Sequence, residues 1–260
     1  MIHAFVGKGG VGKTTISSAF ALELSTNYKT CIISMDFIPM THYIFDKKEK
    51  NLDIIEFTEK DAEREWKKKY GNEVYSMISS FFSIGPEIID HIEKAPGIAD
   101  EFIFSKLLDI RDNYDFIVWD TAASSSTLHL LITEMEFYEH MNRDIRFYLS
   151  IKETLNKIKK GNVDPLQILE KWRDLAKNVW NLISQETIFN IVETDDELAY
   201  LQGKDIAKEL NQMGLRIGYH ILNRSKGKHS ESVQIPELDG SPREIVEKIR
   251  PFLKNLVPKK

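Results

Sequence analysis

Residues 7–15 read Gly-Lys-Gly-Gly-Val-Gly-Lys-Thr-Thr and lie between the apolar stretch 2–6 and a segment with helical periodicity. The first, sixth, seventh and eighth residues of this stretch match the template G-x-x-x-x-G-K-[ST] of a phosphate-binding loop. Glycines let the backbone wrap closely around phosphate oxygens, and a helix that begins near Lys13 adds the positive end of its dipole. We therefore predict a buried strand, a phosphate-binding loop and a helix, in this order.

The chemistry of the loop assigns a role to each of its side chains. Lys13 is expected to reach the β- and γ-phosphates of a nucleotide, and the Thr14 hydroxyl to hold Mg²⁺. ATP and Mg²⁺ are therefore the predicted cofactors. The alternative is a glycine-rich turn with a chance lysine, but the spacing and the flanking segments agree with the motif. The expected nucleotide contacts are Gly9, Gly10, Val11, Gly12, Lys13, Thr14 and Thr15.

Two aspartates follow apolar segments that are typical of strands. Asp36 comes after the segment 30–34, and Asp120 ends the segment 114–120. The carboxyl ends of parallel strands form the rim where such sheets bind nucleotides. Asp36 is a candidate for positioning or activating the attacking water, and Asp120 for binding Mg²⁺ through its water shell. Helix capping is the alternative role for both residues.

The composition indicates an ordinary folded domain. The chain has 260 residues, 42% of them apolar and 29% charged, with a net charge of −5. This charge gives no electrostatic reason to expect nucleic acid as the main partner. No apolar run approaches the ~18 residues of a membrane-spanning helix, and no secretory signal is evident. We expect a cytoplasmic protein.

Two segments rich in large apolar side chains are expected to form helices. The first, about 59–95, begins with a charged helix that we expect to end near Lys69, before Gly71. The second is about 128–185. Apolar residues at helical spacing are usually core, although a flexible surface for an apolar partner would have the same composition. We predict one domain over residues 1–260, with these segments forming a small helical subdomain.

Four motifs together resemble the arsenite-transporter ATPase family, which includes the Get-pathway ATPases that deliver tail-anchored membrane proteins. They are the phosphate-binding loop, the strand-like segment 51–57, the Pro-Gly-Ile-x₅-Phe segment at 96–104, and Asp-Thr-Ala at 120–122 with Thr-Leu-x-Leu-Leu at 127–131. The resemblance covers most of the chain. It implies an α/β P-loop NTPase fold with a seven- or eight-stranded, mostly parallel sheet flanked by helices. It also implies ATP hydrolysis, a homodimer, and helices that move around an apolar groove for a membrane-protein client.

Three residues receive roles from this resemblance. Lys8 matches the first lysine of the deviant Walker A form K-G-G-x-G-K-[ST], which reaches the nucleotide of a facing protomer. Asn223 matches an asparagine that contacts adenine, and Pro236 matches a proline in a loop that closes over the base. Residue chemistry alone would make Lys8 a solvated loop lysine and Asn223 a turn former.

Both expected switch segments depart from the family pattern. Family members follow the first aspartate with Pro-Ala-His, where this chain has Phe-Ile-Pro at 37–39. They follow Asp-Thr-Ala with Pro-Thr-Gly-His, where this chain has Ala-Ser-Ser-Ser at 123–126. Ser125 thus replaces a glycine whose N–H would sense the γ-phosphate, and serine cannot adopt glycine-only conformations cheaply. We predict normal nucleotide binding with slow or altered hydrolysis.

The single cysteine, Cys31, excludes several chemistries. No Cys-x-x-Cys pair is present to share zinc across a dimer, and soft As(III) needs thiolates, so neither zinc nor arsenite is expected. An electron carrier of the nitrogenase-reductase kind is excluded because it needs cluster-binding cysteines.

Two alternatives to the resemblance stay open. One is a positioning ATPase of the ParA and MinD kind, although no basic patch or terminal membrane helix is evident. The other is a nucleotide-gated regulatory scaffold with little turnover.

Overall fold

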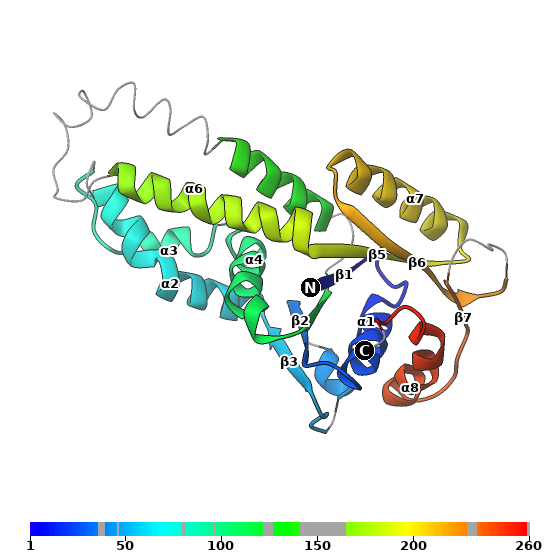
Figure 1. Ribbon diagram of the computed structural model, residues 1–260. Helices are drawn as coiled ribbons and strands as arrows, with labels where there is room; N and C mark the ends of the chain where they lie inside the picture. The colour runs from blue at the N-terminus through cyan, green and yellow to red at the C-terminus, as the bar shows by residue number, and fades with distance from the viewer. Residues whose placement is uncertain are drawn as a thin grey trace. The chain divides into compact units, whose positions relative to one another are not determined.

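The chain folds into two compact units. The computed structural model describes residues 1–35, 40–45, 47–79, 82–95, 97–121, 127–140, 165–227 and 233–258 (Figure 1). The first unit, which we call the sheet unit, contains residues 1–58, 109–129 and 183–260. The second, which we call the helical unit, contains residues 59–108 and 130–182.

The sheet unit is built on a seven-stranded sheet with the order β3-β2-β4-β1-β5-β6-β7. Each pair of neighbouring strands runs parallel, which confirms the predicted α/β fold with a parallel central sheet. The strands are β1 (Ile2–Val6), β2 (Thr30–Met35), β3 (Leu52–Phe57), β4 (Phe116–Asp120), β5 (Thr187–Thr194), β6 (Arg216–Ser225) and β7 (Val233–Pro236).

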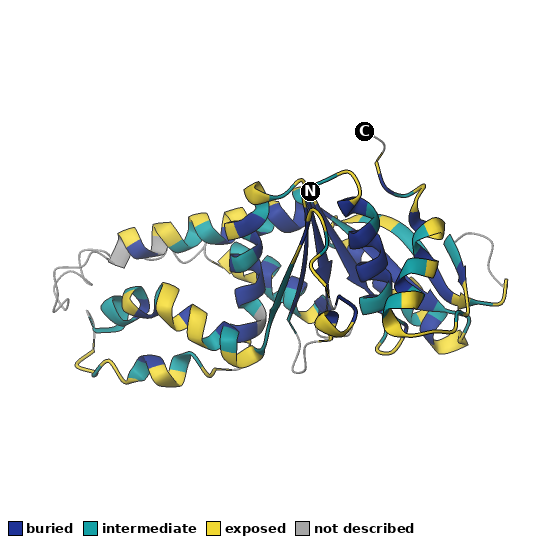
Figure 2. Cartoon of the chain, turned by 90° about the horizontal axis from the view of Figure 1, so that it is seen from below, coloured by how far each residue is buried: buried dark blue, intermediate teal, exposed yellow. Residues whose placement is uncertain are grey.

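Strand β1 lies in the middle of the sheet and is buried along its whole length (Figure 2). An apolar strand covered on both faces is typical of parallel sheets. Phe5 pairs in register with Asp120 of β4 on one side and with Asn190 of β5 on the other. Asp120 is also paired with Ser34 of β2. The sheet therefore carries the predicted metal-binding aspartate beside the end of β1.

Helices cover both faces of the sheet unit. Helix α1 (Lys13–Ser25) and helix α8 (Pro242–Leu253) pack together on one face, and α7 (Glu197–Gln212) lies against β5 and β6 on the other (Figure 1). Large apolar side chains of α1 pack on the sheet; Phe20, for example, packs edge-on against Phe5 with ring centroids 5.3 Å apart. This packing fixes the start of α1, and with it the loop that follows β1. Short single turns in this unit are Thr41–Tyr43 and Arg111–Asn113, and the π-helical turn Leu182–Glu186 leads into β5.

The helical unit is formed by α2 (Glu59–Ser79), α3 (Ile88–Ile92), most of α4 (Ile98–Ile110), most of the helix over 127–140, and α6 (Pro165–Asn181). The sequence prediction that the first of these helices ends near Lys69 was wrong, because α2 continues through Gly71 to Ser79. Gly71 is buried, and a Cβ there would lie 3.1 Å from the Ile89 side chain. Close packing of α2 on α3 therefore overrides the low helix propensity of glycine.

None of the helices in the described part of the chain is long and apolar enough to cross a membrane.

Candidate functional site

The loop between β1 and α1 needs glycine at two positions. At Gly7 the backbone passes so close to β5 that a Cβ would lie 2.2 Å from the carbonyl oxygen of Val192. Gly12 is the N-cap of α1 with a φ of 95°, and a Cβ there would lie 2.4 Å from Asn223 Nδ2. A side chain at either position would displace the loop or its neighbour. The two glycines of the motif are thus required by packing as well as by any ligand.

The Lys13 side chain is folded back over this loop. Its Nζ atom donates hydrogen bonds to the carbonyl oxygens of Gly7 at 3.1 Å and Lys8 at 3.4 Å. Only 9% of Lys13 is exposed. The ammonium group is therefore held inside the loop by its own backbone, at the position from which a lysine can meet a bound phosphate.

Two side chains at the end of β6 hold the loop from the other direction. Asn223, which is buried, donates from Nδ2 to the Val11 carbonyl at 2.8 Å, and the Arg224 guanidinium donates to the Gly10 carbonyl at 2.6 Å. The Asn223 Oδ1 atom accepts the Arg224 backbone N–H at 3.0 Å. In a trans peptide the N–H points opposite to the preceding carbonyl. Fixing these two carbonyls therefore directs the N–H groups of Val11 and Gly12 away from β6.

A cavity of about 260 Å³ opens beside the loop. It brings together four residues that the sequence predicted as nucleotide contacts, namely Gly12, Thr15, Asn223 and Pro236. Pro236 is the last residue of the edge strand β7, pairs with Ser225 of β6, and directly precedes a loop over 237–241. Proline is tolerated on an edge strand since no further strand needs its N–H. The remaining lining residues are Arg224, Glu237, Leu238, Ile245 and Ile249.

Oxygen ligands suited to Mg²⁺ are found at the carboxyl edge of the sheet. Asp120 ends β4, is 6% exposed, and lies in register with Phe5, two residues before the loop. The Thr121 hydroxyl donates to the Phe5 carbonyl at 2.7 Å and ties the ends of β4 and β1 together. Thr14 lies in the first turn of α1. A carboxylate and a hydroxyl are donors that Mg²⁺ prefers, so this set of residues fits the predicted ion.

The outer part of the loop faces solvent. Gly9 and Gly10 are exposed, and the Lys8 side chain is 39% exposed. Its Nζ atom lies 3.7 Å from a carboxylate oxygen of Asp196, the residue that caps the N-terminus of α7. Lys8 is therefore a surface lysine with a weak ionic partner in its own chain.

Some predicted residues lie outside the described part of the chain. These are Asp36, the following segment 37–39, and the segment 122–126 that contains Ser125. Their roles stay predictions. Sequence reasoning missed the loop contact of Arg224, although the residue directly follows Asn223. Asp196 was not singled out either, although an aspartate before a helical pattern is a typical N-cap and it caps α7.

Cys31 takes no part in this site. It is fully buried in β2, and burial raises the pKa of its thiol to about 12. A thiol in this setting is a small apolar side chain rather than a nucleophile or a soft-metal ligand.

A central parallel strand, a glycine loop that closes around a lysine, and a strand-terminal aspartate on the neighbouring strand define a P-loop NTPase. Residues 1–237 match the anion-transporting ATPase family. The chain belongs to this family of ATPases, which confirms the resemblance found in the sequence.

Several relatives are also named as ATPases of this kind. A putative arsenical pump-driving ATPase 2 of Aquifex aeolicus is 30% identical over 247 residues, which are 86% of this chain and 79% of that protein. An ATPase ASNA1 homolog of Plasmodium berghei is 31% identical over 170 residues, which are 63% of this chain and 42% of that protein. A putative arsenical pump-driving ATPase of Chlorobaculum tepidum is 24% identical over 86% of this chain and 60% of its own length. The chain thus spans only part of several relatives.

Proposed function

We propose that this protein binds Mg-ATP and hydrolyses it as a homodimeric switch. The observation that carries the proposal is the arrangement of the loop, where Lys13 is buried among backbone carbonyls and Asn223 and Arg224 hold two more carbonyls outward. Backbone N–H groups fixed before the ligand arrives need little reorganisation to bind phosphate oxygens. The cavity beside the loop offers room for the rest of the nucleotide.

Each residue of this site has a defined task under the proposal. Lys13 stabilises the negative charge of the β- and γ-phosphates, and the loop N–H groups orient them. Thr14 and Asp120 would hold Mg²⁺, which supplies charge neutralisation at the phosphates when it is bound. Asp36 would orient the attacking water. The changed residues at 37–39 and 123–126 support slow turnover.

The exposure of Lys8 supports the dimer. An exposed ion pair such as Lys8–Asp196 contributes only about 0–1 kcal/mol, so little is lost when the lysine leaves it. A facing protomer could therefore recruit Lys8 to its nucleotide. Under this proposal Lys8 completes the site of its partner, and binding of ATP strengthens the dimer.

We also propose that the helical unit captures an apolar membrane-protein client. Large apolar side chains are exposed on this unit: Phe82 is 60% exposed, Ile84 40% and Phe137 38%. Exposed groups of this size mark interaction surfaces when they gather together. Arsenite is not proposed as cargo, because soft As(III) needs several thiolates and Cys31 is the only cysteine.

The experiment is to measure ATP turnover and oligomeric state with Mg²⁺ for the wild type, Lys8→Ala and Lys13→Ala. We expect slow hydrolysis and an ATP-strengthened dimer for the wild type. Lys13→Ala should lose nucleotide binding, whereas Lys8→Ala should bind ATP but lose the dimer and the turnover. Tight ATP binding by the wild type with no turnover would contradict a switch driven by ATP hydrolysis. It would leave a nucleotide-gated scaffold, to which the altered switch segments are also suited.

A further inference from the structure

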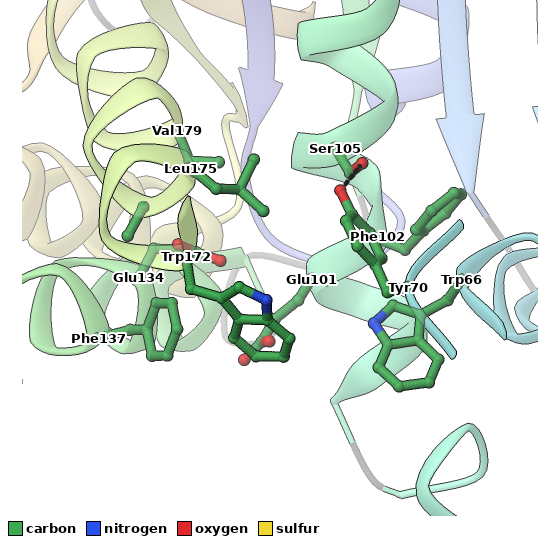
Figure 3. Close-up of a pocket in the computed structure, with 11 residues that line it drawn as sticks. Trp66, Tyr70, Glu101, Phe102, Ser105, Glu134, Phe137, Trp172, Leu175 and Val179 are labelled. Atoms are coloured by element: carbon green, nitrogen blue, oxygen red, sulfur yellow. Dashed lines mark hydrogen bonds between the residues drawn. The ribbon is translucent and has the colours of Figure 1, made fainter. Parts of the chain in front are cut away.

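The helical unit contains a second cavity, of about 100 Å³, which we call the aromatic pocket. Side chains from α2, α4, α6 and the helix over 127–140 line it (Figure 3). Most of the lining is aromatic or aliphatic, and the rings are those of Trp66, Tyr70, Phe102, Phe137 and Trp172. An apolar cavity of about 150 Å³ can hold a benzene molecule. The aromatic pocket therefore has room for a molecule of about one small ring.

The polar atoms of the pocket wall are held by the protein itself. Trp172 Nε1 donates a hydrogen bond to Glu73 at 2.9 Å. The Tyr70 hydroxyl lies 2.6 Å from the Ser105 hydroxyl, which also accepts a hydrogen bond from Lys69 at 2.8 Å. The Lys69 Nζ atom lies 5.4 Å from the centroid of the Tyr70 ring and is thus already the cation over that ring. This part of the wall offers a ligand mainly apolar surface.

Glu134 differs from these residues because its carboxyl group has no partner. It lines the pocket, is only 7% exposed, and forms no hydrogen bond or ion pair with any residue in the described part of the chain. Glu101, the other acidic residue of the lining, is engaged in an interaction of its own. Burial and a nearby second carboxylate both disfavour ionisation, and a neutral carboxyl group carries one O–H that can donate. Glu134 therefore supplies the pocket with an unused hydrogen-bond donor.

We propose that the aromatic pocket binds a small uncharged organic molecule that carries a carbonyl group or another strong hydrogen-bond acceptor. The rings and aliphatic side chains remove the apolar part of this ligand from water. Its acceptor receives the O–H of Glu134, so that a buried polar group without a partner becomes satisfied. A cation is not favoured, because Lys69 already stands beside the wall and Glu134 would have to ionise. A purely apolar molecule would leave the O–H of Glu134 unpaired.

Binding should weaken as pH rises above 7. Burial, with a smaller effect of the Glu101 carboxylate, raises the pKa of Glu134 to about 8, so this group keeps its proton at neutral pH. Between pH 7 and 9 the protonated fraction falls from about 0.9 to about 0.1, and the donor is lost with the proton. The affinity for the ligand should therefore fall about ten-fold over this range. A cation would show the opposite trend, because it favours the carboxylate.

Other charged or titratable groups lie on the elements around Glu134, and Glu134→Gln separates their titration from that of this side chain. Lys171 of α6 is paired with Glu73 of α2. The remaining groups near the pocket are Lys69 and Tyr70 on α2 and Glu101 on α4. On the helix of Glu134 itself, the exposed groups are His129, Glu136, Glu139 and His140.

The test compares cyclopentanone with methylenecyclopentane, which has the same shape but carries a =CH₂ group in place of the carbonyl oxygen. Ligand-observed NMR and tryptophan fluorescence would follow binding of each probe to the full chain, since two tryptophans line the pocket. We expect a dissociation constant on the order of 1 mM for cyclopentanone at pH 7. The decisive quantity is how the affinity ratio of the two probes changes between variants.

Matched variants connect the binding to Glu134. Glu134→Met keeps a similar volume without a donor, so it should weaken cyclopentanone binding about five- to ten-fold and not weaken that of methylenecyclopentane. Glu134→Gln retains a donor in its amide N–H, so it should bind cyclopentanone nearly as the wild type does at pH 7 and equally well at pH 9. Glu136→Met and Glu136→Gln make the same changes at an exposed position of the same helix and should alter nothing. Circular dichroism checks that each variant is folded.

Three outcomes would overturn the proposal: saturable binding of neither probe, an unchanged affinity ratio in Glu134→Met, or cyclopentanone binding that tightens as pH rises. An unchanged ratio would show an apolar cavity in which Glu134 takes no part. ATP affinity, measured in parallel, tests the proposed nucleotide function separately, because no described residue of the phosphate-binding loop lines the aromatic pocket.

Discussion

The Nζ atom of Lys8 lies 3.7 Å from the carboxylate of Asp196 in the same chain. Both side chains are well exposed, at 39% and 62%, so the pair contributes little to stability. Its position on the outer side of the phosphate-binding loop means that Asp196 competes with any facing protomer for this lysine. The ion pair thus opposes the proposed dimer by a small amount.

Removing the charge of Asp196 should strengthen the ATP-dependent dimer. Asp196 also caps α7, where its Oδ1 atom accepts the Ala199 N–H at 3.0 Å. Asp196→Asn keeps a good N-cap and removes only the charge. Each dimer contains two such pairs, so removing about 0.5–1 kcal/mol of competition at each corresponds to a roughly five- to thirty-fold lower dimer dissociation constant with ATP. Analytical ultracentrifugation at several protein concentrations would measure it.

Asp205→Asn is the control for this prediction. It removes one negative charge from an exposed position of the same helix, away from the Lys8 contact. A general effect of net charge would strengthen the dimer in both variants equally, and that result would contradict a specific role of the Lys8–Asp196 pair.

Removal of the Arg224 side chain should weaken ATP binding. Its guanidinium holds the Gly10 carbonyl at 2.6 Å, and the backbone of Arg224 has a left-handed φ of 53°. Loss of this hydrogen bond, worth about 1–1.5 kcal/mol, should raise the ATP dissociation constant of Arg224→Ala about five- to ten-fold. Calorimetric titration with Mg-ATP is the measurement.

Two further variants separate the side chain from the backbone strain. Arg224→Gly should bind ATP as weakly as Arg224→Ala. Its free energy of unfolding should be about 1 kcal/mol higher than that of Arg224→Ala, since glycine adopts this φ without cost. Arg216→Ala removes an arginine from the opposite end of β6 and should bind ATP normally. Normal binding by Arg224→Ala would show that Asn223 alone orients the loop.

Local patterns were sufficient to predict most of the fold. The apolar run of β1 and the glycine motif after it specify strand, loop and helix within one short stretch. The predicted end of α2 was wrong because the true end depends on the contact between Gly71 and Ile89. These residues are separated in sequence and meet only when α2 packs on α3. The four-residue strand β7 was also missed, because it forms through its pairing with β6 and its own residues carry no strand pattern long enough to predict it.

The residues of the candidate site also divide into those that local patterns predict and those that depend on tertiary contacts. The loop residues and Asp120 could be predicted because a motif or a strand end presents them locally. The contact of Arg224 with Gly10 joins residues 214 positions apart. It arises from the strand order β1-β5-β6, which brings the end of β6 to the loop, and no local pattern contains that information.

His3 should make the protein acid-sensitive. Burial, followed by the nearby charges of the N-terminus and Arg216, lowers the pKa of His3 to about 4. Between pH 6.5 and 4 the unfolded chain binds a proton that the folded chain does not, so stability falls as pH decreases, by up to about 1.4 kcal/mol per pH unit. His3→Phe retains a ring against Phe20, and its free energy of unfolding should fall less steeply as pH decreases. Urea unfolding at pH 4.5, 5.5 and 7 would measure it, with the exposed His91→Gln as control.

Glu134 should affect stability in the opposite direction. Its pKa is raised from 4.5 to about 8, so between these values the folded chain keeps a proton that the unfolded chain has lost. Stability should therefore fall as pH rises from 5 to 8, by at most about 1.4 kcal/mol per pH unit. Glu134→Gln should remove this fall and be more stable than the wild type at pH 8, whereas Glu136→Gln should follow the wild type. Parallel curves for the wild type and Glu134→Gln in urea unfolding would contradict a protonated Glu134.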